Sequence, residues 1–261
     1  MIHRGFADFN RNAALEAHLA EHAATTAALI VEPLVQGAAG MAMYPPAYLR
    51  RARELCDIYK VHLIADEIAV GFGRTGTMFA FEQAPPLPLA GGGIKTVRPD
   101  FICLSKGITG GYLPLSAVLT TDDVYAAFYG DATARGFLHS HSYTGNPLAC
   151  RAALAVLDIF EHDNVIAANR VKSIEFTRLL AEVAAYTRVR HFRHLGMIWA
   201  FDVADATPGF SDRFHQAALA QGAFIRPIGS TVYVMPPYVT SADEMRGLAD
   251  AILACLSNPE I

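Results

Sequence analysis

The chain has 261 residues, of which 52% are hydrophobic and 18% are charged, and its net charge is −4. This composition excludes intrinsic disorder, which requires low hydrophobicity and high net charge, and it excludes the polybasic surface that attracts nucleic acid or anionic lipid. Because the sequence has no membrane-length apolar run, no apolar signal core near Met1 and only four scattered cysteines, we expect a cytoplasmic globular protein that binds neither membranes nor nucleic acid.

The first half of the chain alternates short apolar runs with helical patterns. Residues 45–60 place apolar side chains on one stripe, which predicts a helix. The segment 84–99 is rich in proline and glycine and predicts a surface loop. Runs that are apolar on both faces and are separated by helices are typical of a buried, mostly parallel sheet with helices covering it. The predicted strands are residues 27–31, 63–66, 101–104 and 117–119.

Beyond residue 186 the pattern changes to shorter strands interleaved with helices. Two helices precede this region, and the last helix of the chain begins with Ser241-Ala242-Asp243-Glu244, a capping box. We therefore expect two domains, residues 1–164 and a smaller α+β domain over residues 165–261. The helices are predicted at 147–162, 164–184, 210–221 and 242–256, and the strands at 187–192, 196–203, 223–226 and 231–235.

Two polar residues stand where predicted strands end. Asp66 ends the strand 63–66, and Lys106 follows the strand 101–104 by two residues. In open α/β sheets, ligands bind beyond the carboxyl ends of the strands. Taken singly, Asp66 is equally well explained as a helix cap or a local ion-pair partner, and Lys106 as a surface lysine. Together they suit pyridoxal phosphate, because the carboxylate keeps the pyridine nitrogen protonated and the amine holds the aldehyde as a Schiff base.

Four ordered blocks extend this interpretation to a family. They resemble the signature blocks of class III pyridoxal-phosphate aminotransferases, and the resemblance runs from about residue 27 to residue 256. It implies an α/β fold of the aspartate aminotransferase type, with a large domain built on a mostly parallel sheet and a smaller C-terminal α+β domain. The four blocks are Val31-Glu32-Pro33, residues 66–76 (DEIAVGFGRTG), residues 105–111 (SKGITGG) and residues 144–149 (TGNPLA).

The resemblance also implies which residues hold the cofactor. Lys106 corresponds to the Schiff-base lysine and is the expected catalytic residue, and Asp66 corresponds to the partner of the pyridinium nitrogen. Ile68 would pack against one face of the ring. Ser142 falls where the family places a phosphate-binding hydroxyl that comes from the partner subunit, so a homodimer is implied as well.

Two details resemble one branch of the class, which transfers an amino group from S-adenosylmethionine to 8-amino-7-oxononanoate in biotin biosynthesis. They are Ala69 and the segment 225–238, which reads IRPIGSTVYVMPPY. In this branch Arg226 would bind the carboxylate of the oxononanoate, since a guanidinium is a planar fork with a permanent charge. Tyr233 would line the substrate pocket and Arg74 would lie near its mouth.

Other interpretations of the same residues remain open. The family resemblance also fits an aminotransferase that acts on an ω-amino acid or a diamine. His139 and His141 are of a type that ligates metals, but the pattern lacks a third ligand nearby, and we expect no metal site. The glycines between Gly71 and Gly76 lack the Gly-Lys-Ser/Thr ending of a nucleotide phosphate loop.

The sequence departs from the family at its beginning. The family's glycine-serine block, which holds the cofactor phosphate at a helix N-terminus, has no counterpart before the strand at 27–31. We therefore expect the chain to represent the C-terminal portion of such an enzyme, with residues 1–164 forming only part of the large domain. An inactive remnant that binds the cofactor weakly or not at all is the third hypothesis.

Overall fold

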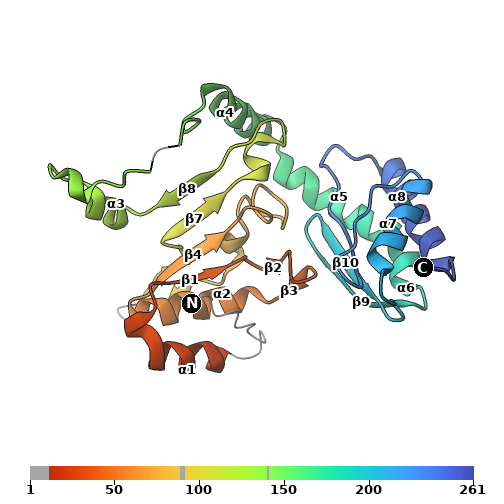
Figure 1. Ribbon diagram of the computed structural model, residues 1–261, viewed down its shortest axis with the longest axis horizontal. Helices are drawn as coiled ribbons and strands as arrows, with labels where there is room; N and C mark the ends of the chain where they lie inside the picture. Colours follow the sequence, from red (N-terminus) through yellow and green to blue (C-terminus); the bar gives the residue numbers. More distant parts are fainter. Residues whose placement is uncertain (1–11, 89–91, 140) are drawn as a thin grey trace. The chain divides into compact units, whose positions relative to one another are not determined.

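The computed structural model describes residues 12–88, 92–139 and 141–261 (Figure 1). Its contacts divide the chain into two compact units. The first unit comprises the segments up to Leu34, Tyr44–Phe72 and Thr77–Asp163, and the second comprises Val35–Met43, Gly73–Gly76 and Asn164–Ile261. The two short segments 35–43 and 73–76 were not predicted from the sequence to join the C-terminal unit.

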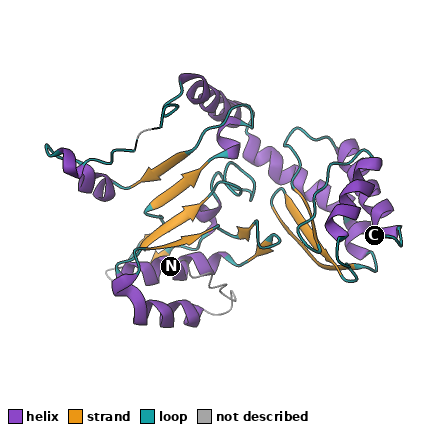
Figure 2. Ribbon diagram, in the orientation of Figure 1, coloured by secondary structure: helices purple, strands orange, loops and turns teal. Residues whose placement is uncertain are grey.

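The first unit is built on a four-stranded sheet with the order β1-β4-β7-β8 (Figure 2). The first three strands run parallel, and β8 runs antiparallel to β7. The mostly parallel sheet predicted from the sequence is thus present. The strands are β1 (Ala28–Val31), β4 (His62–Asp66), β7 (Phe101–Leu104) and β8 (Ala117–Thr120).

The helices α2 and α4 of the first unit begin where their sequences favour it. Helix α2 starts with Pro46 in its first turn, where no N–H partner is needed, and is followed by Lys60 in the left-handed conformation. Helix α4 begins at Pro147, and the Asn146 side chain accepts hydrogen bonds from Leu148 N and Ala149 N. The helices are α1 (Asn12–His22), α2 (Pro46–Tyr59), α3 (Asp122–Phe128) and α4 (Pro147–His162), with 3-10 turns η1 (Ala23–Thr25), η2 (Ala80–Gln83), η3 (Lys106–Thr109) and η4 (Thr133–Arg135).

The loop predicted at 84–99 contains two short strands, β5 (Leu87–Pro88) and β6 (Ile94–Lys95), which pair antiparallel. Its residues 89–91 lie outside the described part of the chain.

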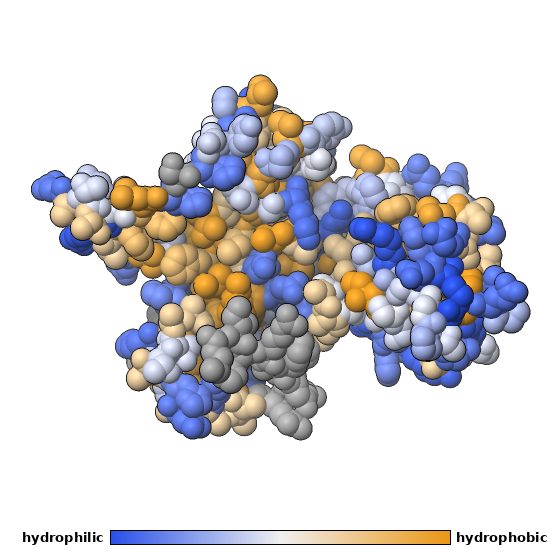
Figure 3. Space-filling model, in the orientation of Figure 1, coloured by the Kyte–Doolittle hydropathy of each residue, from blue (hydrophilic) through white to orange (hydrophobic). Residues whose placement is uncertain are grey.

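The two faces of the first unit's sheet differ in burial. Leu63, Ala65 and Leu104 lie on one face and are buried, and α2 packs against β4. On the other face Ile30 is 60% exposed and Val118 is 62% exposed. Figure 3 shows hydrophobic side chains, coloured orange, gathered over these strands. The prediction that the strands at 27–31 and 117–119 are buried was therefore wrong for this face. The apolar composition of a strand does not determine whether a neighbouring element covers both of its faces.

The second unit contains a three-stranded antiparallel sheet in the order β11-β10-β9, together with a small hairpin of β2 and β3. Its core includes Phe176, Trp199, Phe201 and Phe214, all fully buried. The predicted capping box is confirmed, because Ser241 and Glu244 hydrogen-bond each other's backbone N–H at the start of α8. The strands are β2 (Val35–Gln36), β3 (Ala42–Met43), β9 (Val189–Leu195), β10 (Ile198–Val203) and β11 (Thr231–Val234); the helices are α5 (Val165–Leu179), α6 (Ala181–Ala185), α7 (Phe210–Ala220) and α8 (Ala242–Ser257).

Two predictions for the second unit were wrong. Residues 223–226 form no strand: the carbonyl of Ile225 is bonded to the ring of His215 instead of to a strand partner. The single helix predicted over 164–184 is two helices, α5 and α6, which are interrupted at Leu180. Leu180 is buried, and its apolar side chain continues the helical pattern through the break.

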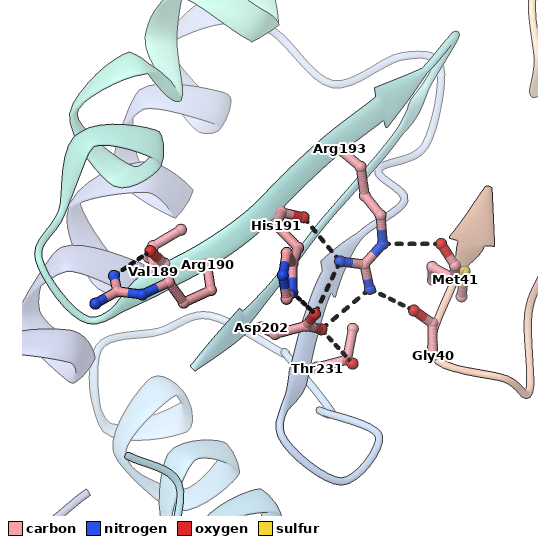
Figure 4. Close-up of polar contacts among 8 residues, drawn as sticks. All are labelled: Gly40, Met41, Val189, Arg190, His191, Arg193, Asp202 and Thr231. Atoms are coloured by element: carbon pink, nitrogen blue, oxygen red, sulfur yellow. Dashed lines mark hydrogen bonds and ion pairs between the residues drawn. The ribbon is translucent and has the colours of Figure 1, made fainter. Parts of the chain in front are cut away.

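An arginine fastens the β2–β3 hairpin to the sheet of the second unit (Figure 4). Arg193 donates hydrogen bonds to the carbonyls of Gly40 and Met41 at 2.6 and 3.0 Å. Its guanidinium also pairs with Asp202, with an Nη2–Oδ1 distance of 3.1 Å. Asp202 accepts a further hydrogen bond from the Thr231 hydroxyl at 2.7 Å and pairs with the His191 ring at 3.0 Å. This cluster explains why residues 35–43 belong to the second unit.

Candidate active site

Asp66 and Lys106 follow neighbouring parallel strands in the structure, as the sequence predicted. Asp66 is the last residue of β4 and is in register with Cys103 of β7. The pairing extends one residue further, because Glu67 N donates to Cys103 O at 3.0 Å. Lys106 begins η3, two residues after the end of β7. The carboxylate and the amine therefore emerge at the same edge of the sheet.

The turns that carry these two residues are in contact. A Cβ atom added to Gly107 would lie 2.9 Å from the Cβ of Phe72, so only glycine permits this approach. Gly107 directly follows Lys106, and Phe72 lies in the turn that follows Asp66. The close packing fixes the turn of the lysine against the turn of the aspartate.

Lys106 has an unusual backbone and an exposed side chain. Its φ is +47°, in the left-handed region that non-glycine residues rarely adopt. Such a conformation costs about 1–2 kcal/mol and persists where the surrounding structure enforces it. The side chain is exposed, and Lys106 forms no ion pair with any residue in the described ranges. A primary amine held in this way is available to a ligand.

Asp66 is half-buried and has one oxygen unused. Its Oδ1 accepts a hydrogen bond from Ile68 N at 3.1 Å, and Oδ2 accepts none from the residues that the structure describes. Burial and then the negative charge of Asp66 raise the pKa of the Cys103 thiol. Ile68 is half-buried in the same turn. Asp66, Ile68 and Lys106 are therefore brought together in the first unit.

Glu67 is a site residue to which the sequence interpretation assigned no role. It is fully buried, and its carboxylate accepts hydrogen bonds from Ala80 N and Phe81 N, both at 2.9 Å. Burial raises its pKa to about 7, against the lowering effect of these two bonds. The sequence does contain a signal for this residue, because two acids, Asp66 and Glu67, stand side by side at the end of a buried strand. Neighbouring side chains of a strand point to opposite faces, so the two acids are expected to have different surroundings.

Arg74 lies in the second unit and is half-buried. Its Nη1 donates to Pro236 O at 2.6 Å, and its guanidinium lies 4.4 Å from the centre of the Tyr238 ring. Burial lowers the pKa of Arg74, and burial raises the pKa of Tyr238 to about 12. The segment is held at its backbone as well, because Met197 N donates to Arg74 O at 2.7 Å.

The remaining predicted site residues lie in less enclosed places. Tyr233 is half-buried on β11, in register with Ala200 of β10. Arg226 is exposed on the irregular segment before the turn to β11, with its guanidinium 5.5 Å from the centre of the Phe224 ring. Ser142 is exposed in the first unit, in a turn that precedes α4.

Within the described residues, no group of three or more His, Cys, Asp or Glu side chains could hold a metal ion. No helix in the described ranges is both long and apolar enough to cross a membrane.

A family model matches nearly the whole sequence. The description of the model is aminotransferase class-III, and it covers residues 7–256. The chain belongs to the class-III aminotransferase family. This confirms the family that the four sequence blocks indicated, and the mostly parallel sheet with helices is the fold expected of it.

Several curated relatives of this class-III chain share a name. The adenosylmethionine-8-amino-7-oxononanoate aminotransferase of Helicobacter pylori is 45% identical over 239 residues, which are 89% of this chain and 52% of that protein. The protein of the same name from Nitratidesulfovibrio vulgaris is 41% identical over 248 residues, 91% of this chain and 44% of the relative. The chain thus spans about half the length of the curated relatives it matches.

Solved structures of class-III members have the same fold. The adenosylmethionine-8-amino-7-oxononanoate aminotransferase of Methanocaldococcus jannaschii superposes with a TM-score of 0.84 at 33% identity, over 94% of this chain and 57% of that one. An amine transaminase from an uncultivated Pseudomonas species, solved in its PLP-bound form, gives a TM-score of 0.79 at 35% identity over 94% of this chain and 55% of that one.

Proposed function

We propose that the chain carries the lysine and the acid of a pyridoxal-phosphate aminotransferase that moves an amino group from S-adenosylmethionine to 8-amino-7-oxononanoate. The observation that carries the proposal is the shared sheet edge of Asp66 and Lys106, which stand at the ends of adjacent parallel strands. Among the described residues, the Lys106 amine has no ion-pair partner and one oxygen of the Asp66 carboxylate accepts no hydrogen bond. The names of the relatives support the choice of substrates.

The donor set fits pyridoxal phosphate. When bound, this cofactor supplies an electron sink for carbanion chemistry. Lys106 supplies the primary amine that attaches the aldehyde, and its Nζ then carries a proton during transfer. Asp66 keeps a proton on the ring nitrogen through Oδ2, the oxygen that Ile68 N leaves unused. Ile68 packs against the ring.

The substrate residues follow from their chemistry. Arg226 offers a planar, permanently charged fork to the carboxylate of the oxononanoate. Tyr233 lines the pocket and Arg74 lies at its mouth. These roles, and the division of the chain into a large domain ending near residue 164 and a small one over residues 165–261, are part of the proposal.

A homodimer completes the proposal, with Ser142 of one subunit binding the cofactor phosphate of the other. Large apolar side chains are exposed along the segment that leads to α4, as expected of a surface that a second subunit covers. They include Tyr112, Tyr129, Phe137, Leu138 and Tyr143. Sedimentation velocity tests this part, and a purely monomeric chain at micromolar concentration would remove it.

Borohydride reduction tests the cofactor assignment. The chain has only four lysines, Lys60, Lys95, Lys106 and Lys172. Incubation with pyridoxal phosphate, reduction and peptide mapping should place the label on Lys106, and Lys106→Arg should abolish it. A label on another lysine, or none on any, rejects the assignment.

A second candidate is an aminotransferase of simple amines. The 35% identity to the amine transaminase, which is similar to that of the adenosylmethionine enzyme of known structure, favours keeping it. Rates of the first half-reaction distinguish the two. Turnover with S-adenosylmethionine supports the first candidate, and fast turnover with simple ω-amines alone supports the second.

A further inference from the structure

Glu67 is a buried carboxylate that the proposed chemistry does not use. Its side chain is 0% exposed, and no cation forms an ion pair with it in the described part of the chain. Burying a carboxylate without a cation is costly, so the charge must be offset by hydrogen bonds. Its two oxygens accept one backbone N–H each, from Ala80 and Phe81 at the start of η2.

The backbone of Glu67 is held at both of its polar atoms. Its N–H donates to Cys103 O on β7, and its carbonyl accepts from Gly71 N at 2.8 Å. A Cβ on Gly71 would lie 2.8 Å from the Glu67 carbonyl oxygen, so the turn closes tightly on this residue. Glu67 is therefore joined to β7, to its own turn and to η2.

Asp66 is the immediate neighbour of this anchored residue. The only hydrogen bond to the Asp66 carboxylate from a described residue comes from Ile68 N, which lies on the other side of Glu67. The direction of the Asp66 carboxylate thus depends on the path of the backbone from 66 to 68, and Glu67 is the middle of that path.

We propose that Glu67 is a positioning residue, which fixes the direction of the Asp66 carboxylate by tying the turn after β4 to the backbone of η2. The role in cofactor binding rests on the proposed function, whereas the mechanical link between Glu67 and Asp66 does not. Two N–H donors require two acceptor oxygens, which a carboxyl group offers with or without its proton and an amide does not.

The test compares Glu67→Gln with Glu82→Gln. The first substitution keeps the shape of the side chain but turns an amide NH2 toward one of the two N–H groups. Glu82 is a matched control, because it is an exposed acid on the same turn whose carboxylate also accepts one backbone N–H, from Phe79.

The first measurement is amide hydrogen exchange of Ile68 by NMR, on the full chain without cofactor. The Ile68 N–H reports directly on the Asp66 carboxylate that it bonds. We expect Glu67→Gln to speed its exchange at least about tenfold, as for the loss of one hydrogen bond to a charged acceptor, and Glu82→Gln to change it less than about twofold. Faster exchange at Ala80 and Phe81 with unchanged Ile68 would overturn the proposal.

A second variant approaches the same contact from the other side. Ala80→Pro removes the N–H that bonds Glu67 Oε2, at the first position of η2 where proline is tolerated. This variant should also speed the hydrogen exchange of the Ile68 amide. If Glu67→Gln does not fold, as judged by reaction of the buried Cys56 thiol, Ala80→Pro decides, and an unchanged Ile68 amide then rejects the role.

The second measurement is the binding of pyridoxal phosphate, followed by its visible absorbance as a function of pH. Glu67→Gln should raise the apparent Kd for pyridoxal phosphate about tenfold and should shift the pH midpoint of the absorbance band. A loss of stability alone would not shift that midpoint. Glu82→Gln should leave both unchanged. If the unsubstituted chain binds no cofactor, the proposed function fails, and the exchange measurement alone still accepts or rejects the positioning role.

Discussion

The sheets of the two units are buried to very different degrees. In the second unit the central strand β10 is buried along nearly its whole length, with Ile198 at 0% and Trp199 at 1% exposure. In the first unit β1 exposes Ile30, and β8 exposes Val118 and Leu119. The strands compared, β10 in the second unit and β1 and β8 in the first, are all mainly apolar in sequence.

The difference shows that an apolar run stabilises a fold only as far as neighbouring elements remove it from water. Within the described chain, the helices α5 to α8 pack around the core of the second unit. The first unit's sheet has α2 against one face and exposes Ile30 and Val118 on the other. Equivalent substitutions in the two sheets should therefore have unequal effects.

The largest expected difference is between Ile198→Ala and Ile30→Ala. The same atoms are removed, but Ile198 is fully buried whereas Ile30 is 60% exposed. We expect a loss of about 2–5 kcal/mol of unfolding free energy for Ile198→Ala and a change within about 0.5 kcal/mol for Ile30→Ala.

Each unit has its own probe for this experiment. Fluorescence of Trp199, the single tryptophan, reports urea unfolding of the second unit. Pulsed labelling of the buried Cys56 reports the first unit. A loss above about 2 kcal/mol for Ile30→Ala would mean that this face is covered in solution, and the comparison would fail.

The next effect concerns the buried carboxyl group of Glu67 in the first unit. Because burial raises the pKa of Glu67 from 4.5 to about 7, the folded chain binds this proton more tightly than the unfolded chain does. The stability of the first unit should then fall as the pH rises from about 4.5 to about 7, by about 3 kcal/mol in total from this group.

Glu67→Gln has no such proton to lose, so it should remove this pH dependence. The measurement is the urea midpoint of Cys56 protection between about pH 5 and about pH 8, with the labelling pulse at one fixed pH. Asp100 is an internal contrast: burial opposes its ionisation, but hydrogen bonds from Arg53 and Leu63 N lower its pKa. The stability that Asp100 contributes is therefore lost only as the pH falls. An identical pH slope in Glu67→Gln would contradict the prediction.

A third effect sharpens the comparison inside the second unit. Gly196 has φ +57°, and a Cβ there would lie 2.3 Å from the Arg74 carbonyl oxygen. Gly229 has φ +59° with nothing within 4 Å of a Cβ. Gly229→Ala should cost about 1–2 kcal/mol for the left-handed backbone alone, and Gly196→Ala should cost about 1–3 kcal/mol more for overpacking. The free energy of unfolding of both variants is measured by Trp199 fluorescence. Equal losses in the two variants would show that the backbone around Arg74 moves to accommodate the added methyl group at position 196.

Local sequence signals were enough for elements that depend on local chemistry. The Ser241 capping box, Pro147 after the Asn146 cap, and the strands that end at Asp66 and before Lys106 all follow from short-range rules. These rules predicted the edge of the sheet at which Asp66 and Lys106 both stand.

Features set by distant residues were not predictable. The segment 223–226 has a strand-like composition, but the His215 ring takes its carbonyl. Residues 35–43 join the second unit because Arg193 donates hydrogen bonds to the carbonyls of Met41 and Gly40. These residues are 152 and 153 positions away from Arg193 in the sequence. Glu67 acquires its role from Ala80 and Phe81, which are adjacent only after folding.

The smallest effect is expected at the Arg193 cluster of the second unit, which lies at the surface. The His191 ring pairs with Asp202 at 3.0 Å, but its side chain is 80% exposed. Burial opposes ionisation of Asp202, and hydrogen bonds from Thr231, Arg193 and His191 together lower its pKa. Since Thr231 and Arg193 remain, loss of the histidine leaves the carboxylate with partners.

His191→Asn suits this test because asparagine tolerates the left-handed backbone that His191 adopts at φ +49°. The free energy of unfolding from Trp199 fluorescence should change by less than about 1 kcal/mol. Arg193→Lys, which breaks the paired bonds to Gly40 and Met41, should cost more than His191→Asn does. A larger loss at His191 than at Arg193 would mean that the exposed ring, and not the guanidinium, holds the hairpin to the sheet.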